Sequence, residues 1–158
     1  MFRIIAGIIV GFIVMFVLVM ATFGITMMVL GLEGTLQPGS YWTTNTFNII
    51  VLIGGTTGAI IGGLVCGLIA RRVAAGFALA VIVLVMGVGS AVANMSKPDP
   101  PARAGAATLQ DISQHGKEPT WFAYSKAALG ALGVFIGASM VKKRGPTTND
   151  PEIGRGFK

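Results

Sequence analysis

Charge is scarce in this sequence, and long runs of residues lack it altogether. Only 11% of the 158 residues are charged, whereas 53% are hydrophobic. Residues 4–32, 47–70 and 73–95 contain no Asp, Glu, Lys, Arg or His, and residues 121–141 contain only Lys126. A helix needs roughly 20 apolar residues to cross a hydrocarbon core about 30 Å thick. The four runs therefore predict an all-α, polytopic protein of the lipid bilayer with four transmembrane helices.

Residues that commonly carry chemistry are scarce as well. The chain has a single cysteine, Cys66, and a single histidine, His115. A metal site takes three or four ligands, and the nearby Asp111 and Glu118 would complete only a loose set in a loop. The sequence contains no phosphate-binding loop, nucleophile elbow or helical zinc motif, and no predicted span contains an acidic residue. We therefore expect no metal, no cofactor and no enzymatic activity, with Cys66 as a small packing residue.

Glycine, in contrast, is abundant, with 23 residues, most of them inside the apolar runs. In residues 47–70 two neighbouring series of small residues recur at every fourth position, and residues 121–141 contain a similar series. The glycines concerned are Gly54, Gly55, Gly58, Gly62, Gly63, Gly67, Gly130, Gly133 and Gly137. Small residues at this spacing let transmembrane helices approach closely. We expect glycine-rich packing of these two spans at the centre of the bundle, or their contact with another chain.

The Lys and Arg residues outside the spans predict the orientation of the chain. Eight of them precede the first span, connect the second to the third, or follow the fourth, whereas three lie in the opposite loops. Cytoplasmic segments of membrane proteins carry the excess of Lys and Arg. We therefore expect both termini in the cytoplasm and the protein in an inner membrane of bacterial type. Topology also accounts for the net charge of +6, so we expect no nucleic-acid partner.

Residues 1–144 are expected to form a single membrane domain, followed by a flexible cytoplasmic tail over residues 145–158. The first apolar run has 29 residues, whereas the apolar region of a signal peptide has about 7 to 15. This run is therefore predicted to be a true span. Because it is longer than the bilayer core requires, it should tilt or project beyond the bilayer. A bend could be absorbed at Gly24 or Gly31, near Thr22 and Thr26.

The connections differ greatly in length. Only residues 71–72 separate the second and third runs, which predicts a tight hairpin of two directly neighbouring helices. The outer loop, residues 96–120, begins with a proline-rich segment. Within it, apolar residues about three apart predict a short surface helix from about 102 to 114 that ends at Gly116. Thr120 is expected to be the N-cap of the last span.

Several residues near the span ends are suited to the membrane surface. The expected interfacial anchors are Trp42, Trp121, Tyr124 and Lys126, and the expected contacts to anionic lipids are Arg71, Arg72, Lys142, Lys143 and Arg144. Lys126 lies five residues into the last span, so its flexible stem can carry the ammonium group back to the head groups. The alternative is a functional ion pair with a loop carboxylate such as Glu33 or Asp111.

Without catalytic residues, three functions are open. The leading hypothesis is a small accessory, assembly or stabilising subunit, whose partners are other membrane proteins or copies of itself. The second is a homo-oligomeric channel or facilitator for a small solute, lined by Thr56, Thr57 and Ser90, although such hydroxyls commonly bond to their own helix. The third is a lipid- or pigment-binding protein with a groove beside the glycine face.

Overall fold

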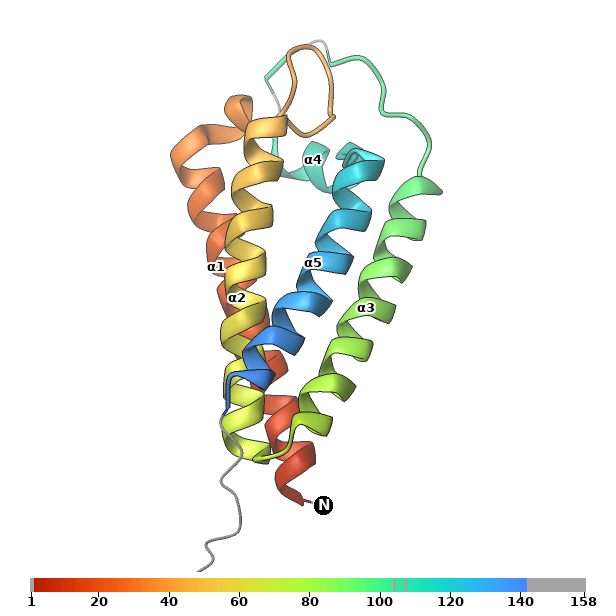
Figure 1. The fold of residues 1–158 in the computed structure, drawn as a ribbon. Helices are drawn as coiled ribbons and strands as arrows, with labels where there is room; N and C mark the ends of the chain where they lie inside the picture. Colours follow the sequence, from red (N-terminus) through yellow and green to blue (C-terminus); the bar gives the residue numbers. More distant parts are fainter. Residues whose placement is uncertain (1, 104, 107, 142–158) are drawn as a thin grey trace, which may run out of the picture.

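The computed structural model describes residues 2–103, 105–106 and 108–141. These residues form five helices and no strand (Figure 1): α1 (Phe2–Thr35), α2 (Asn45–Ala70), α3 (Val73–Met95), α4 (Leu109–His115) and α5 (Thr120–Ser139). Helices α1, α2, α3 and α5 are each long and apolar enough to cross a membrane. The described chain is thus all-α with four candidate spans, which confirms the prediction from the charge-free runs. The tail predicted for residues 145–158 lies outside the described residues.

The four long helices run between two ends of the molecule (Figure 1). The terminal end carries the start of α1, the connection of α2 to α3 and the end of α5. The loop end carries residues 36–44, residues 96–103 and the short helix α4. The two kinds of connection, very short and long, therefore lie at opposite ends of the bundle.

Helix α1 is the longest, with 34 residues, or about 51 Å at 1.5 Å per residue. It bends at Gly31, where φ is 68° and ψ is 172°. A residue with a side chain rarely adopts a positive φ, whereas glycine does so without steric cost. The prediction of a bend in this overlong span is therefore confirmed at Gly31, while Gly24 lies in regular helix.

Local caps define both ends of α2. The Thr44 hydroxyl accepts a hydrogen bond from the backbone N–H of Phe47, at 3.4 Å. At the other end Arg71 adopts the left-handed conformation, with φ 53° and ψ 24°, and its N–H donates to the carbonyl of Gly67. A left-handed residue at this position is a common way to end a helix. It turns the chain sharply enough for α3 to begin at Val73.

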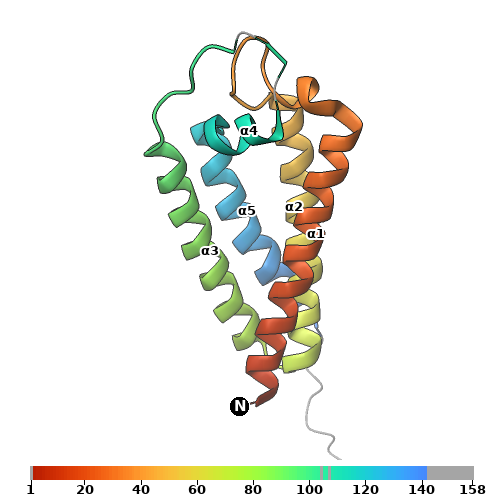
Figure 2. The ribbon, with the colours of Figure 1, turned by 180° about the vertical axis from the view of Figure 1, so that it is seen from behind.

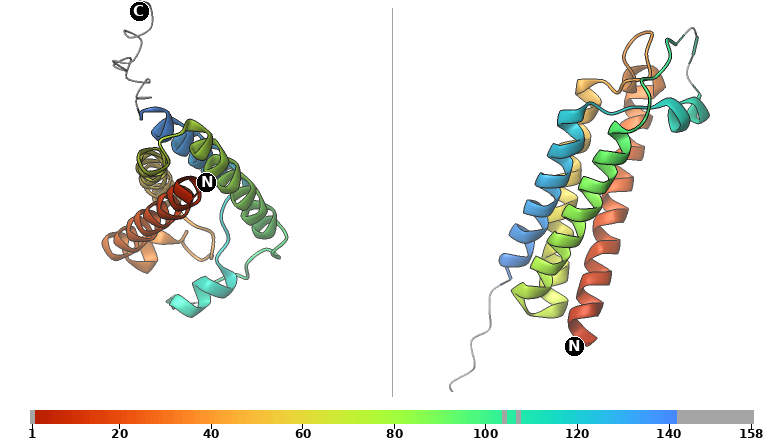
Figure 3. Two further views of the ribbon diagram at one scale, coloured as in Figure 1. Left: turned by 90° about the horizontal axis from the view of Figure 1, so that it is seen from below. Right: turned by 90° about the vertical axis from the view of Figure 1, so that its right-hand side faces the viewer.

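The long helices pack in the order α1, α2, α5, α3, with α2 and α5 in the middle (Figure 3). The predicted tight connection at residues 71–72 is present and α2 contacts α3, but α3 packs mainly against α5. Small residues on α3 explain the difference. A Cβ atom on Gly76 would overlap the Cβ of Ala138, and one on Gly87 would lie 2.7 Å from the Cβ of Ala127. The α3 backbone therefore approaches α5 closely at both positions.

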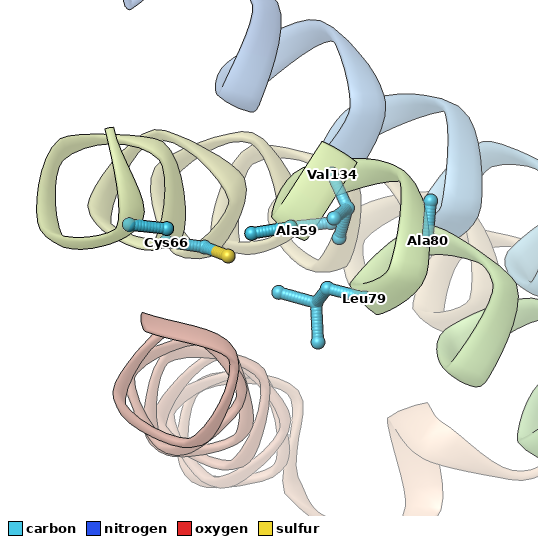
Figure 4. Close-up of a cluster of buried hydrophobic side chains, with 7 residues drawn as sticks. Ala59, Cys66, Leu79, Ala80 and Val134 are labelled. Atoms are coloured by element: carbon cyan, nitrogen blue, oxygen red, sulfur yellow. The ribbon is translucent and has the colours of Figure 1, made fainter. Parts of the chain in front are cut away.

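A cluster of buried apolar side chains fills the middle of the bundle and its terminal half. Figure 4 shows Ala59 and Cys66 of α2, Leu79 and Ala80 of α3, and Val134 of α5 in this cluster. Partly buried side chains of α1 complete it, namely those of Ile4, Ile8, Phe12 and Met15. Toward the loop end, α1 and α3 diverge (Figure 2). The core is therefore closed at one end of the bundle, while the helices spread at the other.

Two predictions about the outer loop need correction. The surface helix begins at Leu109, later than predicted, because the Thr108 hydroxyl and the Asp111 carboxylate cap each other's backbone N–H groups and fix the first turn there. Its predicted end at Gly116 is confirmed. Thr120 is the first residue of α5 and not its N-cap. Pro119 takes that place, and its carbonyl accepts hydrogen bonds from the next helical N–H groups.

Candidate functional site

A cavity of about 200 Å³ lies among all four long helices. It is lined by the middle of α1 and by the loop-end halves of α2, α3 and α5. The walls are almost entirely apolar, and the polar side chains among the lining residues are those of Thr56, Ser90 and Lys126. The cavity thus occupies the part of the bundle where α1 and α3 diverge (Figure 2).

Small residues keep this space open. Gly55 lines the cavity, and a Cβ built on it would meet no atom within 4 Å. Gly130 also lines it, with Val83 3.5 Å from the position of a Cβ. Ala59 and Ala127 contribute two further short side chains. Because larger residues at these positions would occupy the space, these four short residues of α2 and α5 help to keep the cavity open.

An ion pair stands at the loop end of the cavity. The ammonium group of Lys126 binds the carboxylate of Glu118, and the two side chains are 32% and 31% exposed. The same ammonium lies 5.5 Å from the ring centroid of Phe122, another lining residue. The structure thus gives Lys126 a loop carboxylate as its partner, the arrangement predicted as the alternative to snorkelling, with Glu118 in place of Glu33 or Asp111. The pair offers a donor and an acceptor side by side without net charge.

Asn94, near the end of α3, holds Glu118 in place. Its side-chain amide donates to the Glu118 carbonyl at 2.9 Å, and its side-chain oxygen accepts from the Glu118 N–H at 3.3 Å. Nearby, the Tyr124 hydroxyl donates to the sulfur of Met95 at 3.2 Å. These contacts join the end of α3 to the start of α5, so they set the separation of these helices beside the cavity.

Of the two threonines predicted to provide a polar lining, Thr56 lines the cavity and Thr57 does not. The hydroxyl of Thr56, which lines the cavity, donates to the carbonyl of Leu52 at 2.7 Å. The hydroxyl of Thr57 donates to the carbonyl of Ile53 at 2.9 Å, and Thr57 is exposed and does not line the cavity. Each hydroxyl proton is therefore used by its own helix. Thr56 and Ser90 both line the cavity, and a hydroxyl oxygen can still accept a hydrogen bond.

Two further ion pairs stabilise the loop end. Arg103 binds Glu33 through two hydrogen bonds, at 2.9 and 2.6 Å, which raises the pKa of the Arg103 side chain. Lys117 binds Asp99 at 2.9 Å and lies 5.3 Å from the ring centroid of Trp42. Backbone hydrogen bonds from Thr43 and Lys117 join the two loops. The described residues of the loop end therefore form an ordered surface over this end of the bundle.

Most of the predicted glycine positions face another helix within this chain. A Cβ on Gly63 would overlap the carbonyl of Val134, and one on Gly137 would overlap the carbonyl of Ile60. The same holds for Gly54, Gly58, Gly62, Gly67 and Gly133, where a Cβ would have an atom of another helix within 3.2 Å. Gly55 and Gly130 differ, because they border the cavity. The glycine series is thus used largely for contacts within the chain.

The predicted membrane-surface residues lie at both ends of the bundle. Trp121 and Tyr124 are 46% and 42% exposed near the start of α5. Trp42 is half-buried between the loops. Arg71 and Arg72 are exposed at the terminal end. The remaining predicted lipid contacts, residues 142–144, lie outside the described residues.

The sequence pattern does not identify Glu118 as the partner of Lys126. The carboxylates predicted as partners are used elsewhere: Glu33 binds Arg103. Asp111 caps α4, where hydrogen bonds from Thr108 lower the pKa of its carboxyl group. Glu118 precedes α5, so helical periodicity does not relate it to Lys126. The position of Asn94 next to Glu118 depends on how α3 packs, and no local sequence pattern contains that information.

The described residues also contain no group of three His, Cys, Asp or Glu side chains that could hold a metal ion.

A buried polar side chain lies near the cavity. Asn48 is completely buried in α2, one turn before the lining residues Val51 and Leu52. Neither its Oδ1 nor its Nδ2 has a hydrogen-bond partner among the described residues. An unpaired polar group of this kind usually costs about 1 to 3 kcal/mol. Asn48 therefore destabilises this part of α2 relative to an apolar residue of the same shape.

No protein-family model, curated protein or solved structure matches this chain. Its function therefore has to be inferred from the cavity, the ion pairs and the surfaces described above.

Proposed function

We propose that this protein is a non-catalytic membrane protein that binds the apolar part of a lipid or of another membrane-soluble molecule between its helices. The cavity is the observation that carries this proposal. Its apolar walls suit a hydrocarbon chain or ring, and Thr56, Ser90 and the Lys126–Glu118 pair offer hydrogen bonds to a neutral polar group. Ligand sites commonly combine a mainly apolar lining with a few polar groups.

The size of the cavity limits what it can hold. Sites for drug-sized ligands span roughly 300 to 1,000 Å³, whereas an apolar cavity of about 150 Å³ holds a benzene molecule. At about 200 Å³, this cavity has room for one ring or a segment of one chain. The rest of the ligand would extend into the bilayer between α1 and α3, where the helices diverge (Figure 2).

In this proposal the loop end faces away from the cytoplasm, and both termini are cytoplasmic in an inner membrane. The distribution of charge supports this orientation. Over the full sequence, eight Lys and Arg residues precede the first span, lie between the second and third spans or follow the fourth, and three lie in the two loops of the other side. Cytoplasmic segments carry such an excess of Lys and Arg.

The substitution Gly55→Leu tests the proposed site. Because no atom lies within 4 Å of a Cβ at this position, leucine can fill the cavity without displacing a helix. Steric overlap with the ligand, at the usual overpacking cost of about 1 to 3 kcal/mol, would weaken ligand affinity roughly 5- to 150-fold. The measurement is mass spectrometry of molecules that co-purify with wild-type and variant protein in mild detergent.

Gly24→Leu is the matched control for this experiment. Gly24 is exposed on α1, and no atom lies within 4 Å of its Cβ position either. We expect this variant to retain the wild-type ligand, and both variants to remain folded by size-exclusion chromatography. If Gly55→Leu carried as much of the same hydrophobic molecule as wild type, the proposed cavity site would be wrong.

An accessory or assembly role is the second candidate, and the ordered loop end favours it. Arg103, Glu33, Lys117 and Asp99 hold this surface together without a partner, so it could bind another protein without first becoming ordered. The same purification separates the two functions. A membrane protein recovered at constant stoichiometry, with no bound hydrophobic molecule, would favour the accessory role.

The channel hypothesis gains no comparable support, because Thr57 does not line the cavity and the apolar core fills the terminal half of the bundle.

A further inference from the structure

A second apolar depression lies on the outer surface of the bundle, between α3 and α5. It measures about 400 Å³, and all of its lining side chains are apolar. The alanines Ala80, Ala128 and Ala131 make room for it, while Phe77 and Phe135 stand toward the terminal end. It shares no lining residue with the cavity between the four helices. This α3–α5 groove is therefore a separate feature.

The groove begins near two exposed arginines, Arg71 and Arg72. Phe77 is five residues after Arg72, or about 7.5 Å along a helix. Arg71 and Arg72 are both exposed, and the ion pairs among the described residues involve only Arg103, Lys117 and Lys126. The guanidinium groups at this end are thus available to an external anion.

We propose that the α3–α5 groove holds an acyl chain of an anionic phospholipid whose phosphate binds Arg71 and Arg72. The apolar lining suits a hydrocarbon chain, and the two arginines lie where a head group would reach the membrane surface. Arginine matches phosphate geometry well because its planar group can donate two parallel hydrogen bonds. This site is independent of the ligand proposed for the central cavity.

The shape of the groove favours a lipid over a second copy of this chain. Close packing of another helix would require a complementary face of small residues. Most glycines of α2 and α5 already contact helices of the same chain. A flexible acyl chain needs no such complementary face, and the bilayer supplies it at the depth of the groove.

Lipid titration of the full chain, followed by native mass spectrometry, tests the charge requirement. The probes are phosphatidylglycerol and phosphatidylcholine with identical acyl chains. Two basic residues at a membrane surface together contribute enough attraction for about a 30-fold difference in affinity. We therefore expect the double substitution Arg71→Gln and Arg72→Gln to weaken phosphatidylglycerol binding by up to this factor. Arg3→Gln, which removes one exposed charge from the same end, is the control and should have little effect.

The acyl-chain contact is tested separately by Ala128→Phe. Ala128 is exposed in the groove, so phenylalanine should fill the groove and reduce binding of both lipids severalfold. Leu129→Phe alters a neighbouring exposed residue that does not line the groove, and it should bind normally. Ala128→Leu repeats the test with a smaller side chain if the phenylalanine variant does not fold.

Three results would overturn the proposal. The first is unchanged phosphatidylglycerol binding in the double arginine variant, and the second is an equal loss in Arg3→Gln, which would indicate unspecific attraction. The third is normal lipid binding in folded Ala128→Phe or Ala128→Leu. The cavity variant Gly55→Leu should retain phosphatidylglycerol in this assay. Failure of the groove proposal can therefore be distinguished from failure of the cavity proposal.

Discussion

Lys126 shows how one charged side chain can lie in a spanning helix at little cost. It begins two turns inside α5, yet its ammonium reaches Glu118, which precedes the helix. Both side chains retain about a third of their exposure, at 32% and 31%. The pair therefore resembles an interfacial ion pair more than a buried one, and each member keeps part of its hydration.

We predict that Lys126→Gln leaves the protein inserted and folded. Exposed ion pairs usually contribute up to about 1 kcal/mol, and glutamine can still donate a hydrogen bond to Glu118. Trp121 and Tyr124 remain to anchor this end of the helix. The measurement is the free energy of unfolding in mixed detergent micelles, compared with wild type.

Glu118→Gln is the matching control, because it neutralises the partner and leaves Lys126 in place. Its effect should be of similar size to that of Lys126→Gln. A loss of about 3 to 5 kcal/mol in either variant would instead indicate a buried pair. That outcome would make the ion pair a principal support of the loop end.

At the scale of the helices, glycine positions differ in what a methyl group would meet. At Gly63 and Gly137 a Cβ would overlap backbone carbonyl groups of the neighbouring helix. Backbone atoms cannot rotate away as a side chain can, so the helices would have to separate. At Gly55 the same methyl group would enter the cavity.

We therefore predict opposite effects of alanine at glycine positions of α2 and α5. Gly63→Ala and Gly137→Ala should each destabilise the bundle by about 1 to 3 kcal/mol, the usual cost of overpacking. Gly55→Ala should be neutral or stabilise the protein by up to about 1 kcal/mol, because alanine favours helix more than glycine does. Thermal unfolding of the three variants in one detergent provides the comparison. Equal stability of all three would show that α2 and α5 do not pack through these glycines.

The elements themselves could be predicted from the sequence because membrane spans depend on local composition. The charge-free run over residues 73–95 has the same bounds as α3, and that over residues 47–70 differs from α2 only at its start. The packing of α3 could not be predicted in this way. A two-residue connection indicates adjacency at one end only, and Gly76 and Gly87 contact α5 along the rest of α3.

The candidate site was less predictable than the helices. Gly55 belongs to the same four-residue pattern as Gly63, yet one borders a cavity and the other contacts a backbone. This difference depends on the divergence of α1 and α3. Because that divergence results from the packing of several helices, the sequence of one segment does not predict it. The Lys126–Glu118 pair depends likewise on the position of the loop relative to α5.

For the whole molecule, the two ends of the bundle differ in both charge and packing. The described acidic residues and the ion pairs between described residues lie at the loop end, where the chain forms an ordered surface over the cavity. The terminal end has the closed apolar core and exposed arginines with no ion-pair partner among the described residues. The proposed sites follow the same division. The Lys126–Glu118 ion pair, which has no net charge, lies beside the cavity, and Arg71 and Arg72 lie beside the α3–α5 groove.

This asymmetry makes orientation a prediction about the entire chain. Because eight of the Lys and Arg residues outside the spans belong to the segments of the terminal side and three to the loops of the other side, the terminal end should be cytoplasmic. Reporter domains inserted at Gly39 should be active only outside the cytoplasm, and reporters inserted at Arg72 or fused after Lys158 only inside it. A cytoplasmic signal at Gly39 would reverse the orientation. It would also place the arginines opposite the anionic cytoplasmic leaflet, so the groove would no longer face the lipid proposed for it.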